Sequence, residues 1–320
     1  TDRYKALQKI INKGEFPRKC WGLSGLPIPN GPMDAWAQCR LLVPERVPPY
    51  ANRFKESVMR QVSQYVWIPK PNALEIVQEA MQPAIRYHRD ECIDLPPCTY
   101  ETRTVELTPP QKLAYKEMLA QLTTQIEGGQ VTAVNEAVKA QKLIQISCGV
   151  VYGKDGQSLE LDSMPRLEVV KETIEESATK VIVFVPFVAV VEHVTAYLRK
   201  FFTVECIHRN VSKNERDRIF SDFQRTPNPK VLVASPATMS HGLTLTEAST
   251  IIWFGPIAST DIFLQANGRI TRPGQRNNQL IMLIEGTDVE RKYYARLKAK
   301  EKVQGTLLEM IKGDREASSV

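Results

Sequence analysis

Short apolar runs alternate with amphipathic segments through the second half of the chain, from about residue 165 onward. Five runs are rich in valine and isoleucine, which is typical of strands buried on both faces of a parallel sheet. These expected strands occupy residues 180–187, 203–208, 230–235, 250–255 and 279–285. The segments between them predict covering helices at residues 187–200, 212–224 (with Ser212 as N-cap), 259–269 and 287–303. This alternation indicates an α/β fold.

The first half of the chain differs, because dense proline breaks separate helical stretches there. Residues 101–107 alternate between apolar and polar side chains and predict a strand. Long helical periodicity predicts helices at residues 110–126 and 131–147. Residues 149–160 have the turn chemistry of a hairpin or linker, and we expect the domain boundary there.

Composition and charge narrow the class of protein. The 320 residues are 42% hydrophobic, which is enough for packed cores, and no stretch resembles a membrane span. The net charge of +6 permits a polyanionic partner without demanding one. The six cysteines are scattered, without a CxxC pair or a neighbouring histidine at metal-ligand spacing, so neither a zinc site nor a disulfide framework is favoured. We therefore expect an intracellular protein with reduced thiols and no membrane partner.

The most informative stretch is QANGRITRPGQ at residues 265–275. It places Arg269 and Arg272 three residues apart, after an expected helix and before an expected strand. A guanidinium binds phosphate oxygens in a bidentate way, so two of them at this spacing suit the γ-phosphate of a nucleotide. An isolated pair of this kind is more often a solvated or salt-bridged helix end, and the residues alone leave that alternative open.

Several segments, in order along nearly the whole chain, resemble the superfamily-two helicase-like ATPases and specifically the Swi/Snf-type double-stranded DNA translocases. Residues 265–275 resemble motif VI, and residues 235–256 resemble motif V with the strand that follows it. Residues 180–198 resemble motif IV, with Phe187 closing its strand. Residues 23–30 and the following MDAWAQCRLLVP are similar to motif III and its trailing helix. Further resembling segments are residues 84–115, 143–149 and 207–224.

The resemblance implies a RecA-like parallel-sheet architecture with an α-helical insertion. Residues 1–44 would end the N-terminal RecA-like lobe, residues 45–150 would form a helical protrusion and lobe-linking region with one strand of that lobe, and residues 151–320 would form the C-terminal lobe. ATP and Mg²⁺ are the implied cofactors, and double-stranded or branched DNA is the implied partner. The implied activity is ATP-driven remodelling or reannealing of DNA by a compact bacterial or viral motor, cytoplasmic in that case, with a nuclear location left open.

The resemblance also assigns roles to individual residues. Arg269 and Arg272 are the implied arginine fingers, reaching across the lobe interface to ATP, and Gln265 and Gln275 would orient them. The residues implied in nucleotide binding are Gln265, Gly268, Gln275 and Gly242. Those implied in DNA binding or coupling are Ser24, Gly25, Asn30, Ser240 and Thr244. Ordinary turns remain the alternative for these motif III and motif V positions, and no metal ligand is expected.

The chain departs from the family pattern at two motif positions and lacks two of the family's motifs. Leu26 stands where the family usually has threonine, and Thr244 stands where it usually has asparagine. No GxxxxGK[ST] phosphate loop and no DExH-type strand end occur in the sequence. We expect both in a missing N-terminal RecA-like segment, from the same protein or a separate chain, and we expect the 320 residues alone to be inactive. A non-catalytic half-motor that binds DNA or regulates a partner stays open, whereas a dehydrogenase is disfavoured because no GxGxxG follows a strand.

Overall fold

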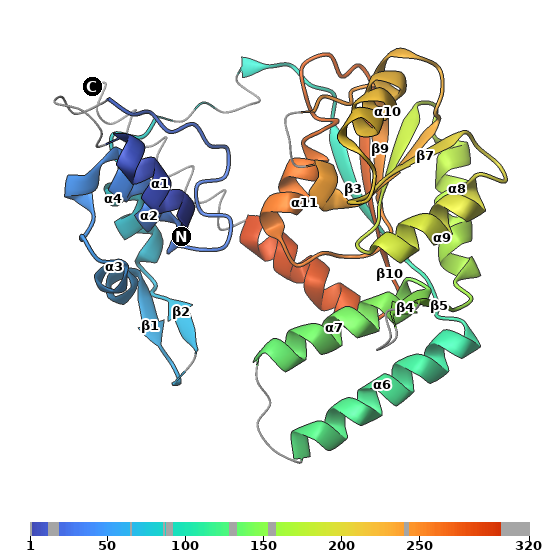
Figure 1. Ribbon diagram of the computed structural model, residues 1–320, viewed down its shortest axis with the longest axis horizontal. Helices are drawn as coiled ribbons and strands as arrows, with labels where there is room; N and C mark the ends of the chain where they lie inside the picture. Colours follow the sequence, from blue (N-terminus) through green and yellow to red (C-terminus); the bar gives the residue numbers. More distant parts are fainter. Residues whose placement is uncertain are drawn as a thin grey trace. The chain divides into compact units, whose positions relative to one another are not determined.

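The computed structural model describes residues 2–11, 19–64, 66–85, 87, 92–127, 133–152, 158–239 and 243–301 (Figure 1). The chain divides into two compact units. Unit 1 comprises residues 1–92, 259–261 and 297–320, and unit 2 comprises residues 93–258 and 262–296. The main division therefore falls at residues 92–93, earlier than the boundary expected at residues 149–160, while the assignment of the segments to lobes stays a prediction.

Unit 1 is a small helical unit with one β-hairpin. Its elements are α1 (Asp2–Ile11), α2 (Asp34–Leu42), the 3-10 helix η1 (Pro44–Arg46), α3 (Ala51–Val58), β1 (Met59–Gln61), β2 (Trp67–Pro69) and α4 (Ala73–Met81). Phe54, Val58 and Val77 are buried at its core, next to Cys39 of α2. The helix expected after residues 23–30 is α2. The antiparallel β1–β2 hairpin was not predicted, because three-residue strands carry too little pattern to be recognised.

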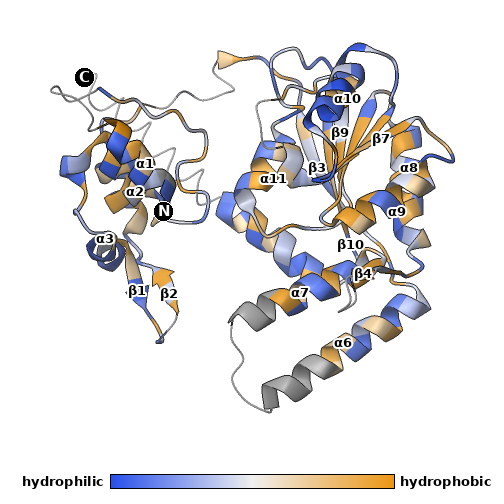
Figure 2. Cartoon of the chain, in the orientation of Figure 1, coloured by the Kyte–Doolittle hydropathy of each residue, from blue (hydrophilic) through white to orange (hydrophobic). Residues whose placement is uncertain are grey.

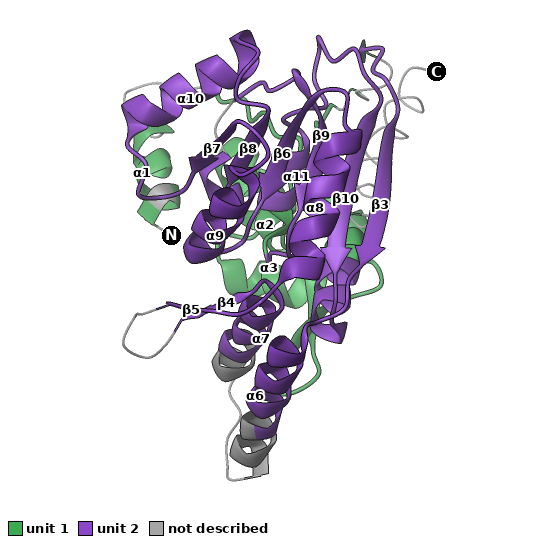
Figure 3. Cartoon of the chain, turned by 90° about the vertical axis from the view of Figure 1, so that its right-hand side faces the viewer, with its two compact units in different colours: residues 1–92, 259–261, 297–320 green, residues 93–258, 262–296 purple. Residues whose placement is uncertain are grey.

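Unit 2 is built on a six-stranded parallel sheet with the order β3-β10-β9-β6-β8-β7, whose strands are labelled in Figure 3. The strands are β3 (Cys98–Thr104), β6 (Lys180–Phe184), β7 (Val204–Ile207), β8 (Val231–Ala234), β9 (Ala248–Trp253) and β10 (Gln279–Glu285). Hydrophobic residues gather on most of these strands in Figure 2, whereas β3 is mainly polar. The five strands expected in the second half of the chain are confirmed, with ends that differ by at most three residues, and so is the α/β fold class with a parallel sheet.

Helices cover both faces of this sheet. They are α8 (Met164–Glu176), α9 (Val188–Leu198), α10 (Lys213–Arg225), α11 (Thr260–Asn267) and a last helix at residues 288–301. The four expected helices are confirmed, and the Glu215 N–H donates to Ser212 Oγ at 3.3 Å, so Ser212 is the N-cap of α10. α8 was not predicted. Phe187 does not close a strand: β6 ends at Phe184, and Phe187 is the N-cap residue of α9.

The hairpin and the two long helices expected between residues 110 and 160 are also confirmed. They are α6 (Pro109–Glu127), α7 (Ala133–Ser147), β4 (Val150–Tyr152) and β5 (Ser158–Glu160). α6 and α7 lie side by side in unit 2, which is purple in Figure 3. Gln111 Nε2 donates to the carbonyl oxygens of Ile146 and Ser147 at 2.8 and 3.1 Å. These bonds fix the start of α6 against the end of α7.

The strand expected at residues 101–107 corresponds to β3, which lies in the same sheet as the strands of the second half of the chain. β3 pairs in parallel with β10, with Cys98 opposite Gln279 and Thr104 opposite Glu285, and so belongs to the same sheet as the C-terminal strands. All its side chains are exposed, as suits an edge strand. Such a strand is held by main-chain hydrogen bonds that any residue can make, so its side chains did not reveal its partner.

Within the described residues, no helix has both the length and the apolar character needed to cross a lipid bilayer.

A thiol reagent at pH 8 is expected to spare Cys39 and Cys148 in the folded protein. Burial raises the pKa of Cys39 to about 11 and that of Cys148 to about 12, because a buried thiolate loses its hydration. The reactive thiolate is then on the order of a thousandth or less of either group at pH 8. Peptide mapping by mass spectrometry after a short reaction should find the label on the exposed Cys20 and Cys98 and not on Cys39 or Cys148. Equal labelling of Cys148 and Cys98 without denaturant would contradict the packing described.

Candidate functional site

Two loops of unit 2 meet beside the end of α11. Residues 243–247 lead into β9, and residues 268–278 connect α11 to β10. The Leu245 N–H donates to the carbonyl oxygen of Arg269 at 3.0 Å, so the two loops are joined through the main chain. Trp253 is buried in β9, as expected of a core residue, and its indole N–H donates to Asn267 Oδ1 at 2.9 Å. This bond anchors the end of α11 where the second loop begins.

Arg269 is buried beside this junction, with only 3% of its surface exposed. Its Nη1 donates to the carbonyl oxygen of Leu243 at 3.3 Å, while its Nε has no hydrogen-bond partner. Arg269 makes no ion pair within the described part of the chain. Burial and, secondly, the charge of Arg272 lower the pKa of this guanidinium. A buried cation with an unused donor beside a second cation would be stabilised by an anion.

Arg272 ties the same two loops together from the other side. Its Nε donates to the carbonyl oxygen of Gly268 at 3.0 Å, and its Nη1 donates to Thr244 Oγ1 at 3.2 Å. Its side chain is half-buried, so it is more accessible than that of Arg269. The two arginines that the sequence singled out therefore lie in one joined loop pair, together with Gly268 and Thr244.

The loop after Arg272 is held in a defined conformation. Gly274 has a φ of 97°, which strongly favours glycine. Gln275 is buried, and its amide donates to the carbonyl oxygens of Ala248 and Ile270 at 2.9 and 3.2 Å. Its Oε1 accepts from the next two main-chain N–H groups. These contacts brace the loop that carries the arginines, whereas Gln265 lies half-buried on α11.

The other site residues expected from the sequence lie elsewhere. Ser24, Gly25 and Asn30 belong to unit 1, in an exposed turn that precedes α2. Ser24 Oγ accepts the Leu26 N–H at 3.1 Å, and the Asn30 N–H donates to a carboxylate oxygen at the start of α2 at 2.6 Å. These bonds are those of a helix-leading turn. Ser240 and Gly242 lie outside the described residues.

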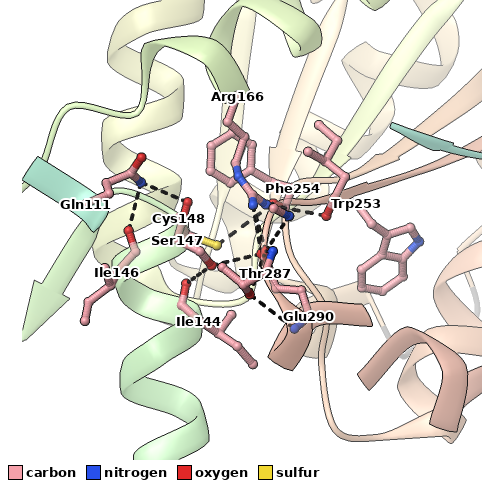
Figure 4. Close-up of polar contacts among 12 residues, drawn as sticks. Gln111, Ile144, Ile146, Ser147, Cys148, Arg166, Trp253, Phe254, Thr287 and Glu290 are labelled. Atoms are coloured by element: carbon pink, nitrogen blue, oxygen red, sulfur yellow. Dashed lines mark hydrogen bonds and ion pairs between the residues drawn. The ribbon is translucent and has the colours of Figure 1, made fainter. Parts of the chain in front are cut away.

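The sequence analysis missed a buried ion pair that lies at the carboxyl ends of β9 and β10 (Figure 4). Arg166 Nη2 lies 2.9 Å from Glu290 Oε1, and these two side chains are 2% and 0% exposed. Arg166 also donates to the carbonyl oxygen of Phe254, and Glu290 accepts from Ser147 Oγ at 2.9 Å and the Thr287 N–H at 3.1 Å. Although burial disfavours its charge, Glu290 raises the pKa of Arg166. The pair links α7, α8, the end of β9 and the last helix. It therefore stabilises the sheet whose strands β9 and β10 follow the arginine loops.

Comparison with known proteins places these loops in a recognised domain. Residues 165–274 match the helicase conserved C-terminal domain, a range that includes both arginines. An uncharacterized ATP-dependent helicase of Mycoplasma pneumoniae is 24% identical over 96% of this chain and 29% of its own length. Protein p41 of Acyrthosiphon pisum secondary endosymbiont phage 1 is 26% identical over 79% of this chain and 54% of its own length. The chain thus spans about half or less of the length of these relatives.

Solved structures share the fold. The C-terminal part of the Fun30 ATPase domain superposes with a TM-score of 0.52 at 16% identity, covering 70% of this chain and 99% of that structure. The Sulfolobus solfataricus SWI2/SNF2 ATPase core in complex with dsDNA superposes with a TM-score of 0.53 at 22% identity, covering 98% of this chain and 67% of that structure. Residues 165–274 therefore match a helicase C-terminal domain, and the chain shares the RecA-like fold of these ATPase structures.

Proposed function

We propose that this chain supplies the second lobe of an ATP-driven motor that moves on double-stranded or branched DNA and remodels or reanneals it. In this proposal, Arg269 and Arg272 contact the phosphates of ATP bound between this lobe and an N-terminal RecA-like segment. The phosphate loop and the acidic strand end that such a motor needs would come from that segment, because neither motif occurs in these 320 residues.

The buried guanidinium of Arg269 is the observation that carries this proposal. Burying a cation without a paired anion is costly, and Arg269 has neither an ion pair within the described residues nor a partner for its Nε. A phosphate would supply both the charge and the acceptor. Arg272, three residues later and held by Gly268 and Thr244, would contact the same anion from the more accessible side.

The residues of this chain would act by position and charge. When bound, ATP supplies the transferable phosphoryl group whose negative charge grows on its oxygens in the transition state. Arg269 and Arg272 would stabilise that charge, and Gln275 would keep the loop between them and β10 from shifting, through its main-chain hydrogen bonds. In this proposal the ligands of Mg²⁺ belong chiefly to the N-terminal segment, which would carry the acidic strand end.

Two observations support DNA as the partner: the fold is shared with a structure solved with DNA, and the net charge of the chain is positive. The Sulfolobus structure that shares the fold was solved with dsDNA. The present chain has a net charge of +6, and Ser24, Gly25, Asn30 and Thr244 are all exposed. These four residues, with Ser240, would contact the DNA backbone or couple it to the nucleotide. Such binding would depend little on base sequence and strongly on salt.

Purified residues 1–320 are expected to hydrolyse ATP no faster than a buffer control, with or without duplex DNA. Arginine side chains alone can hold only one side of the nucleotide, because the backbone amides, lysine and metal of a phosphate loop neutralise the β- and γ-phosphates. The full gene product, or this chain with a separate N-terminal segment, should show DNA-stimulated turnover, measured as released phosphate.

The same assay separates the motor from a regulatory half-motor. DNA binding by the full gene product without any turnover would favour a non-catalytic module. DNA-stimulated hydrolysis by residues 1–320 alone would show that other residues perform the chemistry of the phosphate loop, and the proposed division of roles would be wrong.

A further inference from the structure

A cavity of about 380 Å³ opens in unit 2 at the amino ends of the parallel strands. Its lining comes from the four loops that lead into β6, β8, β9 and β10. The side chains that matter chemically are Lys180, Lys230, Thr246, Glu247, Arg276 and Asn277. Ligands of open α/β sheets usually bind at the opposite edge, beyond the carboxyl ends of the strands. This cavity is therefore separate from the usual place for a ligand in such a sheet.

The cavity has an excess of positive charge. Among the described residues that line it are three cations, Lys180, Lys230 and Arg276, and one carboxylate, that of Glu247. In the part of the chain that the structure describes, none of these three cations forms an ion pair. Three cations of this kind around one recess leave a net positive potential, which attracts anions.

Main-chain carbonyls hold the two ammonium groups in place without neutralising them. Lys180 Nζ donates to two carbonyl oxygens at 2.6 Å each, and Lys230 Nζ donates to two others at 2.7 Å each. An ammonium group has three donors, so each lysine keeps one for a ligand. Burial lowers the pKa of both lysines, although Glu247 and Asp222 partly oppose this effect at Lys180. The positions of both charges are therefore set before any ligand arrives, and an anion in the cavity would stabilise them further.

We propose that this cavity binds the phosphate group of a small anion such as an inorganic or organic polyphosphate. The ammonium groups and the Arg276 guanidinium would supply charge-assisted hydrogen bonds, and Thr246 and Asn277 would supply neutral ones. A recess of this volume at the strand ends suits a small molecule better than a DNA backbone, which needs an extended surface.

The bound anion would also influence the arginine loops. Gly274 and Arg276 follow Arg272 in one loop, and Thr246 and Glu247 follow Thr244 in the other. Both loops that carry the candidate site thus also line the cavity. An anion that holds the far ends of these loops would restrict the movement of Arg272 and Thr244, which makes the cavity a place where a phosphate-bearing effector can regulate the site.

The test is calorimetric titration of the whole chain with pyrophosphate at fixed ionic strength. Arg276→Gln and Lys230→Gln should each weaken binding by about tenfold, the loss expected for one charge-assisted hydrogen bond. Glu247→Gln should tighten binding, because it removes a negative charge that would repel the bound anion. Lys292→Gln is the matched control: it removes one exposed positive charge from the last helix and should change nothing. Arg276 is exposed, so its replacement should leave the thermal unfolding midpoint unchanged.

Two further experiments test whether pyrophosphate binds in this cavity, rather than at the arginine site or at a surface that binds DNA. In an Arg272→Ala background, Arg276→Gln should still weaken pyrophosphate binding and Glu247→Gln should still tighten it. This outcome does not depend on whether Arg272 contacts ATP. A short duplex should not compete with pyrophosphate at equal phosphate concentration. An equal loss with Lys292→Gln, no tightening with Glu247→Gln, or full competition by the duplex would overturn the proposal.

Discussion

Replacing Arg269 or Arg272 by alanine in the complete motor is expected to lower ATP turnover by at least about 100-fold. The affinity for duplex DNA should stay within a few fold, because the lost contact is made chiefly in the transition state. Arg272→Lys should not restore full turnover, since an ammonium group cannot reproduce the planar guanidinium fork. Steady-state phosphate release at saturating DNA, together with DNA binding at fixed salt, measures both quantities.

Matched variants show whether the arginines act on phosphate or only on the loops. Arg291→Ala removes an exposed arginine that pairs with Asp288 and should leave turnover unchanged. Thr244→Val removes the hydroxyl that accepts from Arg272 while keeping both guanidinium groups. If Thr244→Val lowers turnover as much as Arg272→Ala and leaves the affinity for duplex DNA unchanged, the role of Arg272 is to join the loops. Normal turnover in both arginine variants would refute the assignment to ATP.

Glu290→Gln is expected to reduce the free energy of unfolding by about 3–5 kcal/mol, the usual cost of leaving one partner of a buried ion pair uncompensated. The substitution keeps the size of the side chain but leaves the Arg166 guanidinium, 2% exposed, without its counterion. It also weakens the acceptor for Ser147 Oγ and the Thr287 N–H. Urea unfolding followed by tryptophan fluorescence measures the change.

Two comparisons separate a buried charge from general damage. Glu175→Gln removes a carboxylate of the exposed pair with Lys171 and should scarcely change stability. A double variant, Arg166→Met with Glu290→Leu, should lose less than the sum of its two single changes, because no charge is left buried alone. If Glu290→Gln and Glu175→Gln reduce the free energy of unfolding equally, the buried pair contributes no more to stability than the exposed one.

The sheet strands of the second half were predictable because burial on both faces gives a continuous apolar run. KVIVF in β6 and QLIMLIE in β10 show this pattern, and both strands begin at the expected residue. Helix ends with a specific cap were equally accessible, as Ser212 shows. The arginine pair was recognised from its spacing and surroundings, which depend only on local sequence.

Contacts between distant segments were not predictable in this way. Arg166 and Glu290 are separated by 124 residues, and Arg166 lies in α8, a helix that the sequence did not predict. A signal existed in the last helix, where Glu290, Tyr294 and Leu297 recur at helical spacing and all are buried. That spacing places the carboxylate on the buried stripe, although it does not name the partner. The cavity lysines were hidden for the same reason, since Lys180 and Lys230 come together only through sheet pairing.

The pairing of β3 with β10 has a consequence for synthesis of the chain. Cys98 pairs with Gln279, so β3 leaves the ribosome about 180 residues before its partner, a wait on the order of 10 to 40 s at usual elongation rates. During this interval the edge that will meet β10 is open to any other extended segment. β3 reads CTYETRT, whose threonines and charged Glu101 and Arg103 give it little of the apolar, uncharged character that drives strand aggregation. The polar composition that hid the partner of β3 thus allows a nascent chain to carry this strand unpaired until the last strand arrives.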